Sequence, residues 1–195
     1  MSFIKQYFLH PRQVGAVKPS SKRLAKRMLH HVNFEKARCI AEYGPGTGVF
    51  TDEIIRLKRD ETLFLIFEVN DSFCEILKKK YENVPNTHVI HDSAEHIGLY
   101  LCKYNVPKVN YVISGLPFAS LPAEESDRIL KECRKYLSTR GLFITFQYTL
   151  LKVKLFQQYF AIAMVERENR NIPPAYVLNC RKRSKRKRSK RNKNK

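Results

Sequence analysis

The chain has 195 residues, 43% of them hydrophobic, and a formal net charge of +19. This length and composition fit one domain with its own core, and no apolar run approaches the roughly 18 residues that a membrane-spanning helix needs. The opening residues lack the long apolar centre and small-residue cleavage site of a secretory signal, so a cytoplasmic protein is expected.

The positive charge lies at the two ends of the chain. Residues 181–195 hold 11 Lys and Arg and no acid, and residues 1–38 hold nine Lys and Arg and one acid, whereas residues 39–180 hold 17 of each sign. We therefore expect the ends to contact an anionic partner, either a membrane surface or RNA. Residues 181–195 have no apolar side chain to bury and are expected to form a disordered basic tail. The alternative is an appendage for solubility or targeting.

Residues 1–34 are predicted to form two short amphipathic helices. The first gathers four apolar side chains on one side, and the second, capped by Ser20 or Ser21, places Leu24 and Met28 on one face with bases beside them. Such a basic amphipathic pair is typical of an anchor that lies in a membrane interface. The alternative is that these residues dock on the rest of the protein as a lid over its active site.

No metal site is expected from the spacing of histidines and cysteines. The five cysteines lie at least 28 residues apart, which favours reduced, mostly buried thiols over a zinc or redox motif. His30 and His31 are adjacent, and adjacent side chains on a helix diverge by about 100°, so they should not face one ion.

Strands and helices are predicted to alternate through residues 35–180. Apolar, β-branched or aromatic runs predict strands at 38–43, 63–68, 87–91, 109–114, 142–148 and 177–180. Apolar residues at helical spacing predict helices at 50–58, 72–81, 97–104 and 123–137. This alternation is typical of an α/β, Rossmann-like domain with a mostly parallel sheet flanked by helices.

The strongest motif, Glu42-Tyr-Gly44-Pro-Gly46-Thr47-Gly48, ends the first strand and leads into a helix. Alternate glycines let the backbone turn tightly and let a ligand approach N–H groups at a helix N-terminus. Dinucleotide folds favour a different spacing, Gly-x-Gly-x-x-Gly. The acid two residues before the first glycine would repel a phosphate but attract a cationic amino-acid group.

Two further acids follow at strand ends. Glu68 can accept hydrogen bonds from both hydroxyls of a ribose, and Asp92, followed by Ser93, lies where it could reach an adenine amine. Three acids at the ends of successive strands suit a cofactor that carries both adenosine and a positive charge. The alternative is a glycine-rich structural turn with two capping carboxylates.

These motifs resemble the cofactor motifs of class I S-adenosylmethionine-dependent methyltransferases. Other stretches are similar to bacterial phospholipid N-methyltransferases: FLHPRQVGAVKPSS (8–21), LAKRM (24–28), VISGLP (112–117) and NIPPA (171–175). The resemblance spans about residues 3–182 and implies stepwise methylation of the amine of phosphatidylethanolamine, with S-adenosylmethionine as cofactor. The cofactor-binding residues are expected to be Glu42, Gly44, Gly46, Thr47, Gly48, Glu68, Asp92, Ser93 and Ser114.

The related ribosomal RNA adenine dimethylases carry Asn-Leu/Ile-Pro-Tyr/Phe after the fourth strand. There the asparagine amide and the proline carbonyl hold the exocyclic amine, and the ring stacks on the base. The matching residues here are Gly115, Leu116, Pro117 and Phe118, without the asparagine. An alkyl ammonium needs no such amide, because an aromatic face such as Phe118 or Tyr148 can hold it by about 0.5–2 kcal/mol of cation–π attraction. We therefore assign these five residues to the acceptor. For Gly115 the alternative is a simple tight turn.

Lys18, Ser20 and Ser21 are assigned to the lipid phosphate from residue type alone. An alkyl ammonium has a pKa of about 10, so the free amine costs roughly 4 kcal/mol at pH 7, which desolvation lowers; no general base is assigned. The sequence predicts an N-terminal segment (1–34), a methyltransferase domain (35–180) and a tail (181–195), acting on an ethanolamine phospholipid at the cytoplasmic membrane face. The alternatives are an RNA adenine methyltransferase and a cofactor-binding adaptor without catalysis.

Overall fold

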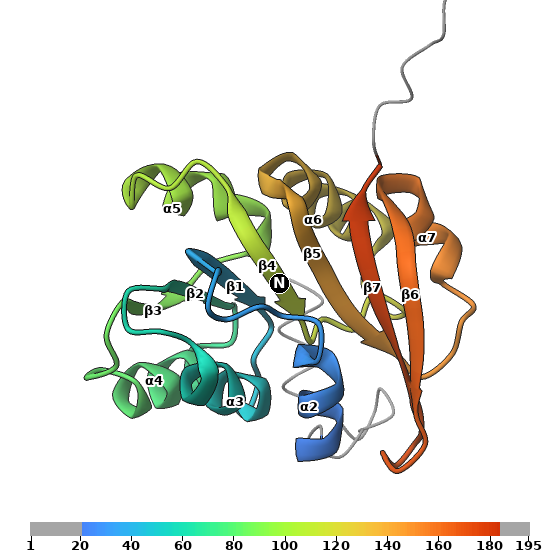
Figure 1. The fold of residues 1–195 in the computed structure, drawn as a ribbon, viewed down its shortest axis with the longest axis horizontal. Helices are drawn as coiled ribbons and strands as arrows, with labels where there is room; N and C mark the ends of the chain where they lie inside the picture. Colours follow the sequence, from blue (N-terminus) through green and yellow to red (C-terminus); the bar gives the residue numbers. More distant parts are fainter. Residues whose placement is uncertain (1–20, 184–195) are drawn as a thin grey trace, which may run out of the picture.

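The structure, a computed structural model, describes residues 21–183, which form a seven-stranded sheet in the order β3-β2-β1-β4-β5-β7-β6 (Figure 1). The parallel strands are β1 (Cys39–Tyr43), β2 (Leu63–Glu68), β3 (Thr87–His91), β4 (Val109–Ser114) and β5 (Leu137–Gln147). β7 (Ala175–Lys182) runs antiparallel between β5 and β6 (Phe160–Glu168). The predicted α/β, Rossmann-like fold with a mostly parallel sheet is confirmed.

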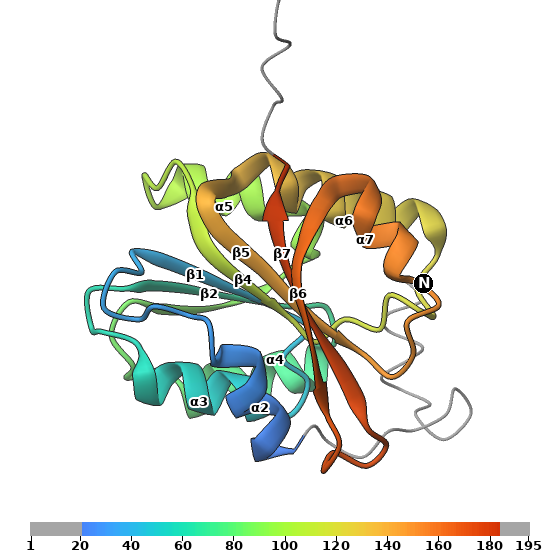
Figure 2. The same cartoon turned by 45° about the vertical axis from the view of Figure 1, so that its right-hand side comes forward.

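Helices cover both faces of the sheet, as Figures 1 and 2 show. One face carries α2 (Lys22–Leu29), α3 (Val49–Leu57) and α4 (Asp71–Lys80). The other carries the 3₁₀ turn η1 (Ala94–His96), α5 (Ile97–Lys103), α6 (Ala123–Tyr136) and α7 (Val153–Tyr159). β1 and β2 are buried along their whole length because they are covered from both sides. Four of the five cysteines are buried, and Cys102 is exposed.

All six predicted strands are present, and the four predicted helices of the body agree with the structure to within one residue. The fifth strand begins five residues earlier than predicted, at Leu137, which pairs with Val109 before a shift in register. α7 and β6 were not predicted. β6 is an edge strand on which most side chains are exposed, so its sequence lacks the alternation of a half-buried strand.

α2 is docked on the body of the protein. Its predicted cap is confirmed, because the N–H of Leu24 donates a hydrogen bond of 3.1 Å to Oγ of Ser21. Leu24 and Met28 are both 0% exposed, in the core that lies under the sheet. The apolar face of this helix is therefore covered by the protein and is not free to enter a membrane, in line with the docked alternative; that the segment acts as a lid over the active site stays a prediction. The other predicted amphipathic helix lies outside the described residues.

The predicted tail begins inside the sheet. Arg181 pairs with Ala161 and Lys182 with Phe160, so β7 continues two residues past the predicted boundary. Arg181 is exposed and Lys182 is half-buried although β7 lies between two strands, so their charge did not distinguish the end of this strand from the basic tail. Residues 184–195, the rest of the predicted tail, lie outside the described residues. Within residues 21–183, no helix is long and apolar enough to cross a membrane.

Candidate cofactor and acceptor site

The predicted cofactor residues meet at one edge of the sheet. β1, β2, β3 and β4 are parallel, so their carboxyl ends lie side by side, with Tyr43 level with Phe67 and with Ser114. The glycine loop, Glu68, Asp92 and the segment after Ser114 all follow these ends. A cavity of about 10 Å³ is lined by residues from each of these segments: Gly44, Glu68, Asp92 and Leu116.

The glycine loop has a backbone that other residues would strain. Gly44, Gly46 and Gly48 have φ angles of +65°, +54° and +84°, in the left-handed region that glycine enters without cost. Gly48 is also the N-cap of α3, and an added β-carbon there would lie 2.8 Å from the hydroxyl of Tyr81. The loop therefore needs glycine for its own geometry, and it delivers the chain directly into the N-terminus of a helix.

Glu42 is completely buried at the end of β1. The hydroxyl of Thr51, in the first turn of α3, donates a 2.8 Å hydrogen bond to its Oε2. Its Oε1 has no hydrogen-bond partner within residues 21–183. Burial, opposed by the Thr51 hydrogen bond, raises the pKa of Glu42 to about 8. An unpartnered buried carboxyl oxygen beside a glycine loop fits the cationic amino-acid end of S-adenosylmethionine, the expected cofactor.

Glu68 holds the glycine loop against β2. Its Oε2 accepts a hydrogen bond from the N–H of Gly46 at 3.2 Å, and its Oε1 accepts from the N–H groups of Val69 and Asn70 at 2.9 Å each. Burial raises the pKa of Glu68 although these backbone hydrogen bonds act in the opposite direction. Because each carboxylate oxygen has two acceptor sites, Oε2 keeps one for a further donor.

Asp92 follows β3 and is held by three neighbours. Its Oδ1 lies 2.7 Å from the N–H of Ser93 and 2.8 Å from Nδ1 of His96, and its Oδ2 accepts from the hydroxyl of Tyr100 at 3.0 Å. Burial alone would raise the pKa of Asp92, but these hydrogen bonds hold it below its ordinary value. Asp92 is therefore a fixed negative charge beside the cavity, and the hydroxyl of Ser93 caps η1.

Gly115 packs directly against the glycine loop. Its N–H donates to the carbonyl of Tyr43 at 2.8 Å, and an added β-carbon would lie only 2.6 Å from the carbonyl oxygen of Gly44. The buried Oγ of Ser114 accepts from the N–H of Leu116 at 3.3 Å. The side chain of Leu116 covers Gly44, where an added β-carbon would lie 2.7 Å from its Cδ2. These contacts leave little space for a side chain at residue 115.

The ring of Phe118 lies in the core, whereas the acceptor hypothesis requires it to face the bound amine. This ring is 1% exposed and packs edge-on against Phe143 and Phe156, with centroids 6.2 Å and 5.3 Å away. A ring enclosed in this way offers no open face to an ammonium group, so the prediction for Phe118 is wrong in this conformation. Tyr148, at the carboxyl end of β5, is only partly buried and stacks edge-on against Phe146 at 5.5 Å.

Of the residues assigned to the lipid phosphate, only Ser21 is among the described residues. Lys18 and Ser20 lie outside the described residues, and the hydroxyl of Ser21 caps α2. Thr51 was missed, although a hydroxyl in the first turn of the helix that follows the glycine loop is a signal that could have identified it. Thr47 is exposed on the loop.

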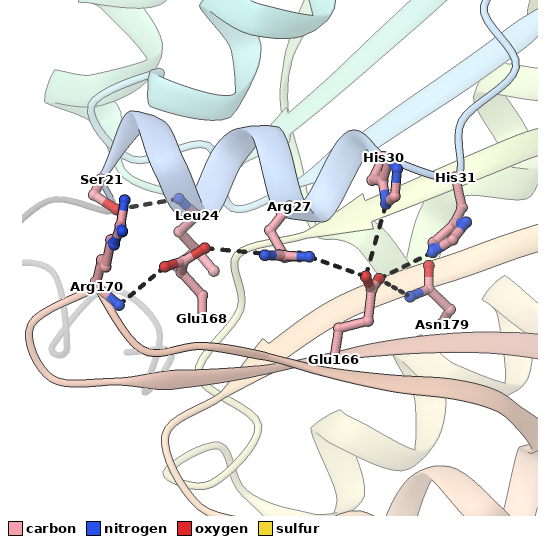
Figure 3. Close-up of polar contacts among 9 residues, drawn as sticks. All are labelled: Ser21, Leu24, Arg27, His30, His31, Glu166, Glu168, Arg170 and Asn179. Carbon is pink, nitrogen blue, oxygen red and sulfur yellow. Dashed lines mark hydrogen bonds and ion pairs between the residues drawn. The ribbon is translucent and has the colours of Figure 1, made fainter.

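The expectation that His30 and His31 diverge is wrong. His30 is the C-cap of α2 and His31 lies beyond the helix, so the angle between neighbours inside a helix does not describe this pair, and the two rings lie 4.7 Å apart (Figure 3). Both approach Glu166, with Nε2 of His31 at 3.0 Å and Nδ1 of His30 at 3.7 Å. Arg27 also lies 3.3 Å from the same carboxylate. Glu166 is therefore a shared partner of three basic groups that tie the end of α2 to β6.

The family model for ribosomal RNA adenine dimethylase matches residues 20–168 of the chain. An ornithine lipid N-methyltransferase of Singulisphaera acidiphila is 25% identical over 181 residues, covering 92% of this chain and 94% of the relative. A ribosomal RNA small subunit methyltransferase A of Mycoplasma mycoides is 27% identical over 157 residues, covering 78% of this chain and 51% of the relative.

Solved structures share the fold at lower identity. A ribosomal RNA methylase from Streptococcus thermophilus superposes with a TM-score of 0.63 at 15% identity, covering 83% of this chain and 95% of that one. At this identity the likeness concerns the fold.

Proposed function

The chain belongs to the ribosomal RNA adenine dimethylase family, and we propose that, within this family, it methylates the alkyl amine of a membrane lipid instead of an adenine. Ethanolamine phospholipid is the first candidate. The chain is an S-adenosylmethionine-dependent N-methyltransferase. The proposal concerns the acceptor and the place of action, a peripheral position at the cytoplasmic face of a membrane.

The observation that carries the proposal is the contact between Gly115 and Gly44. In the adenine-specific pattern an asparagine amide at this position orients the aryl amine. Here a β-carbon on residue 115 would lie 2.6 Å from the carbonyl oxygen of Gly44, a separation that real β-carbons essentially never show. The chain thus has neither the amide nor the room for it, and an acceptor that needs no such amide is favoured.

The carbonyl of Pro117 supports the same conclusion. It accepts hydrogen bonds from the N–H groups of Ser120 at 2.8 Å and Leu121 at 3.0 Å. A carbonyl oxygen has two lone pairs, so both are engaged by the loop itself. In the adenine-specific pattern this carbonyl would instead accept from the base.

The chemistry requires alignment and removal of a proton. The bound cofactor supplies a methyl group that is already activated, so the protein's task is to place the amine in line with it. Glu42 and the glycine loop would hold the cationic amino-acid end of the cofactor, and Glu68 and Asp92 its adenosine. Tyr148, which is half-buried, is the aromatic side chain that would contact the ammonium, and exclusion of water lowers the cost of the neutral amine.

The relatives support a lipid acceptor without excluding RNA. The match to the ornithine lipid enzyme extends over 94% of that protein, and ornithine, like ethanolamine, carries a primary alkyl amine. The family model and the ribosomal RNA relatives favour the second candidate, an RNA adenine methyltransferase. Where the RNA adenine dimethylases carry the asparagine that orients the adenine amine, this chain has Gly115.

The decisive experiment offers both acceptors to the same enzyme. Labelled methyl donor is supplied with phosphatidylethanolamine vesicles, with ornithine-lipid vesicles and with unmodified ribosomal RNA, and the label in each fraction is counted. Label in either lipid supports the proposal. Label in RNA alone would reverse it. Glu42→Ala, prepared in the same way, should lose label in every fraction and so identifies any contaminating methyltransferase.

A further inference from the structure

One face of α2 is entirely basic. Arg23, Lys26, Arg27 and His30 follow the spacing i, i+3, i+4 and i+7, which places them along one side of a helix. The apolar face of the same helix is buried under the sheet. The basic face therefore turns away from the core, toward the hairpin formed by β6 and β7, as Figure 3 shows for Arg27 and His30.

A cavity of about 500 Å³ separates this basic face from the hairpin. We call it the α2–hairpin pocket. Its charged lining consists of five cations and one acid, besides His30: Arg23, Lys26, Arg27, Arg167, Arg170 and Glu168. Two chain segments far apart in sequence thus bring like charges to the same hollow.

Glu168 in the lining and Glu166 beside it, 3.3 Å from Arg27, leave the pocket with more cations than acids. Glu168 accepts a hydrogen bond from the backbone N–H of Arg170 at 2.9 Å and lies 3.6 Å from Nε of Arg27. Within residues 21–183, the side chains of Arg23, Lys26 and Arg170 form no ion pair. Cations that converge on a concave surface focus a positive potential, and an anion placed between them relieves their repulsion.

The pocket lies at the same edge of the sheet as the cofactor loop. Arg167 pairs with Tyr176, and Tyr176 pairs with Gln147, the last residue of β5. Its position is tied to the start of α2, because the N–H of Ser21 donates a 3.4 Å hydrogen bond to Oδ1 of Asn171. An anion bound there would lie at the carboxyl edge of the sheet. In the proposed function the acceptor binds at this edge, next to the cofactor.

Exposed aliphatic side chains at this edge favour a lipid as the source of the anion. Leu150 and Leu151, which follow β5, are 44% and 86% exposed, and Ile172 in the hairpin turn is 78% exposed. Aliphatic groups beside bases are typical of a surface that lies in a membrane interface. Nucleic acid would instead use aromatic rings on which bases stack.

We propose that the α2–hairpin pocket binds the phosphate of a phospholipid head group and so positions the lipid at the carboxyl edge of the sheet. Arginine suits this task because its planar guanidinium group matches phosphate oxygens in pairs. The inference rests on the proposed function for its source of phosphate. It replaces the sequence-based assignment of the phosphate to Lys18, Ser20 and Ser21.

The test removes two charges from the pocket and two from elsewhere. The pocket variant is Arg23→Gln with Arg170→Gln, both exposed side chains without ion pairs in the described part of the chain. The control is Lys79→Gln with Arg140→Gln, two exposed bases away from the pocket with the same loss of charge. Both retain the basic tail, and thermal melting checks that both are folded.

Binding is measured by flotation with phosphatidylcholine vesicles that contain phosphatidylglycerol, without methyl donor. The pocket variant should lose roughly tenfold in partition, and the control less than about threefold, because the pocket acts on individual phosphates rather than through net charge. Equal losses in the two variants would overturn the proposal. An unchanged pocket variant would overturn it as well.

Two further arms identify the source of the anion. Inorganic phosphate and a single-stranded RNA oligonucleotide are titrated against both variants. If the pocket variant loses affinity for RNA but not for vesicles, the pocket is a nucleic-acid site and the lipid is excluded. If it loses only inorganic phosphate, the pocket holds a free ion. These binding measurements do not depend on methyl transfer. They therefore test the pocket even if the labelling experiment finds methyl groups only in RNA and the proposed function fails.

Discussion

The hydroxyl of Thr51 donates a 2.8 Å hydrogen bond to Oε2 of Glu42, and the other oxygen of that carboxyl has no partner in the described part of the chain. The group is completely buried, and burial raises its pKa to about 8. At neutral pH the carboxyl of the ligand-free protein is therefore mostly protonated. A cationic ligand at this site favours the ionised form.

Cofactor affinity should consequently increase with pH. Below the raised pKa of Glu42, binding has to remove a proton, so affinity should increase by up to about tenfold per unit between pH 6 and 7.5 and level off above 8. Isothermal titration in buffers of different ionisation enthalpy should show release of a proton in the lower range. Glu42→Gln should bind more weakly and without this pH dependence. A wild-type affinity that is flat with pH, with no proton released, contradicts the assignment of Glu42 to the cation.

Substitution of Gly115 should disturb the glycine loop as well as the acceptor. Gly115→Asn forces a side chain toward the carbonyl of Gly44 and should cost about 1–3 kcal/mol in the free energy of unfolding. It should also lower the rate of methyl transfer to lipid and the affinity for the cofactor. Ala119→Asn, exposed in the same loop, is the matched control and should change none of these three quantities. Normal stability and turnover of Gly115→Asn would remove the central observation behind the lipid proposal.

Leu24→Ala should destabilise the whole protein. The side chain is 0% exposed under the sheet, and truncation of such a residue costs about 2–5 kcal/mol. Urea denaturation measures this loss, and Lys22→Ala, on the exposed side of the same helix, should be close to neutral. If Leu24→Ala reduced vesicle binding while stability stayed normal, α2 would be an anchor after all.

Phe118 and Tyr148 should respond to mutation in different ways. Phe118→Ala empties a core position and should cost about 3–5 kcal/mol, whereas Phe118→Leu should keep most of the activity because its ring faces no ligand. Tyr148→Ala should mainly raise the KM for the lipid amine, and Tyr148→Phe should restore it because the ring face remains. A Phe118→Leu enzyme with intact stability but no transfer would return Phe118 to the acceptor site.

The predicted tail contains two parts: residues 181 and 182, which belong to β7, and residues 184–195, which follow it. Deletions of different length should have different effects. Removal of residues 184–195 should leave the melting temperature and cofactor affinity unchanged while weakening binding to anionic vesicles. Removal of 181–195 also deletes Arg181 and Lys182, which pair with β6, and should lower the melting temperature. A loss of cofactor binding in the shorter deletion would mean that the tail contributes to the site.

The sequence alone indicated six of the seven strands of the sheet, the glycine loop and the acids beside it. Those features are local: a buried strand is a short apolar run, and Gly44, Gly46 and Gly48 are needed by the backbone angles of a few consecutive residues. Their meeting at one edge follows from parallel strand order. The class of S-adenosylmethionine-dependent methyltransferase and its cofactor could therefore be anticipated, whereas the family model that matches is that of the ribosomal RNA adenine dimethylases and not the phospholipid N-methyltransferases that the motifs suggested.

The tertiary structure decided which surface each remaining side chain meets. The apolar stripe of α2 requires burial but does not say whether lipid or protein supplies it, and only the packing on the sheet shows that it is protein. In the same way, nothing near Phe118 in sequence shows that its ring is enclosed by Phe143 and Phe156. The α2–hairpin pocket joins residues more than a hundred positions apart, and such contacts depend on how elements pack rather than on any local pattern.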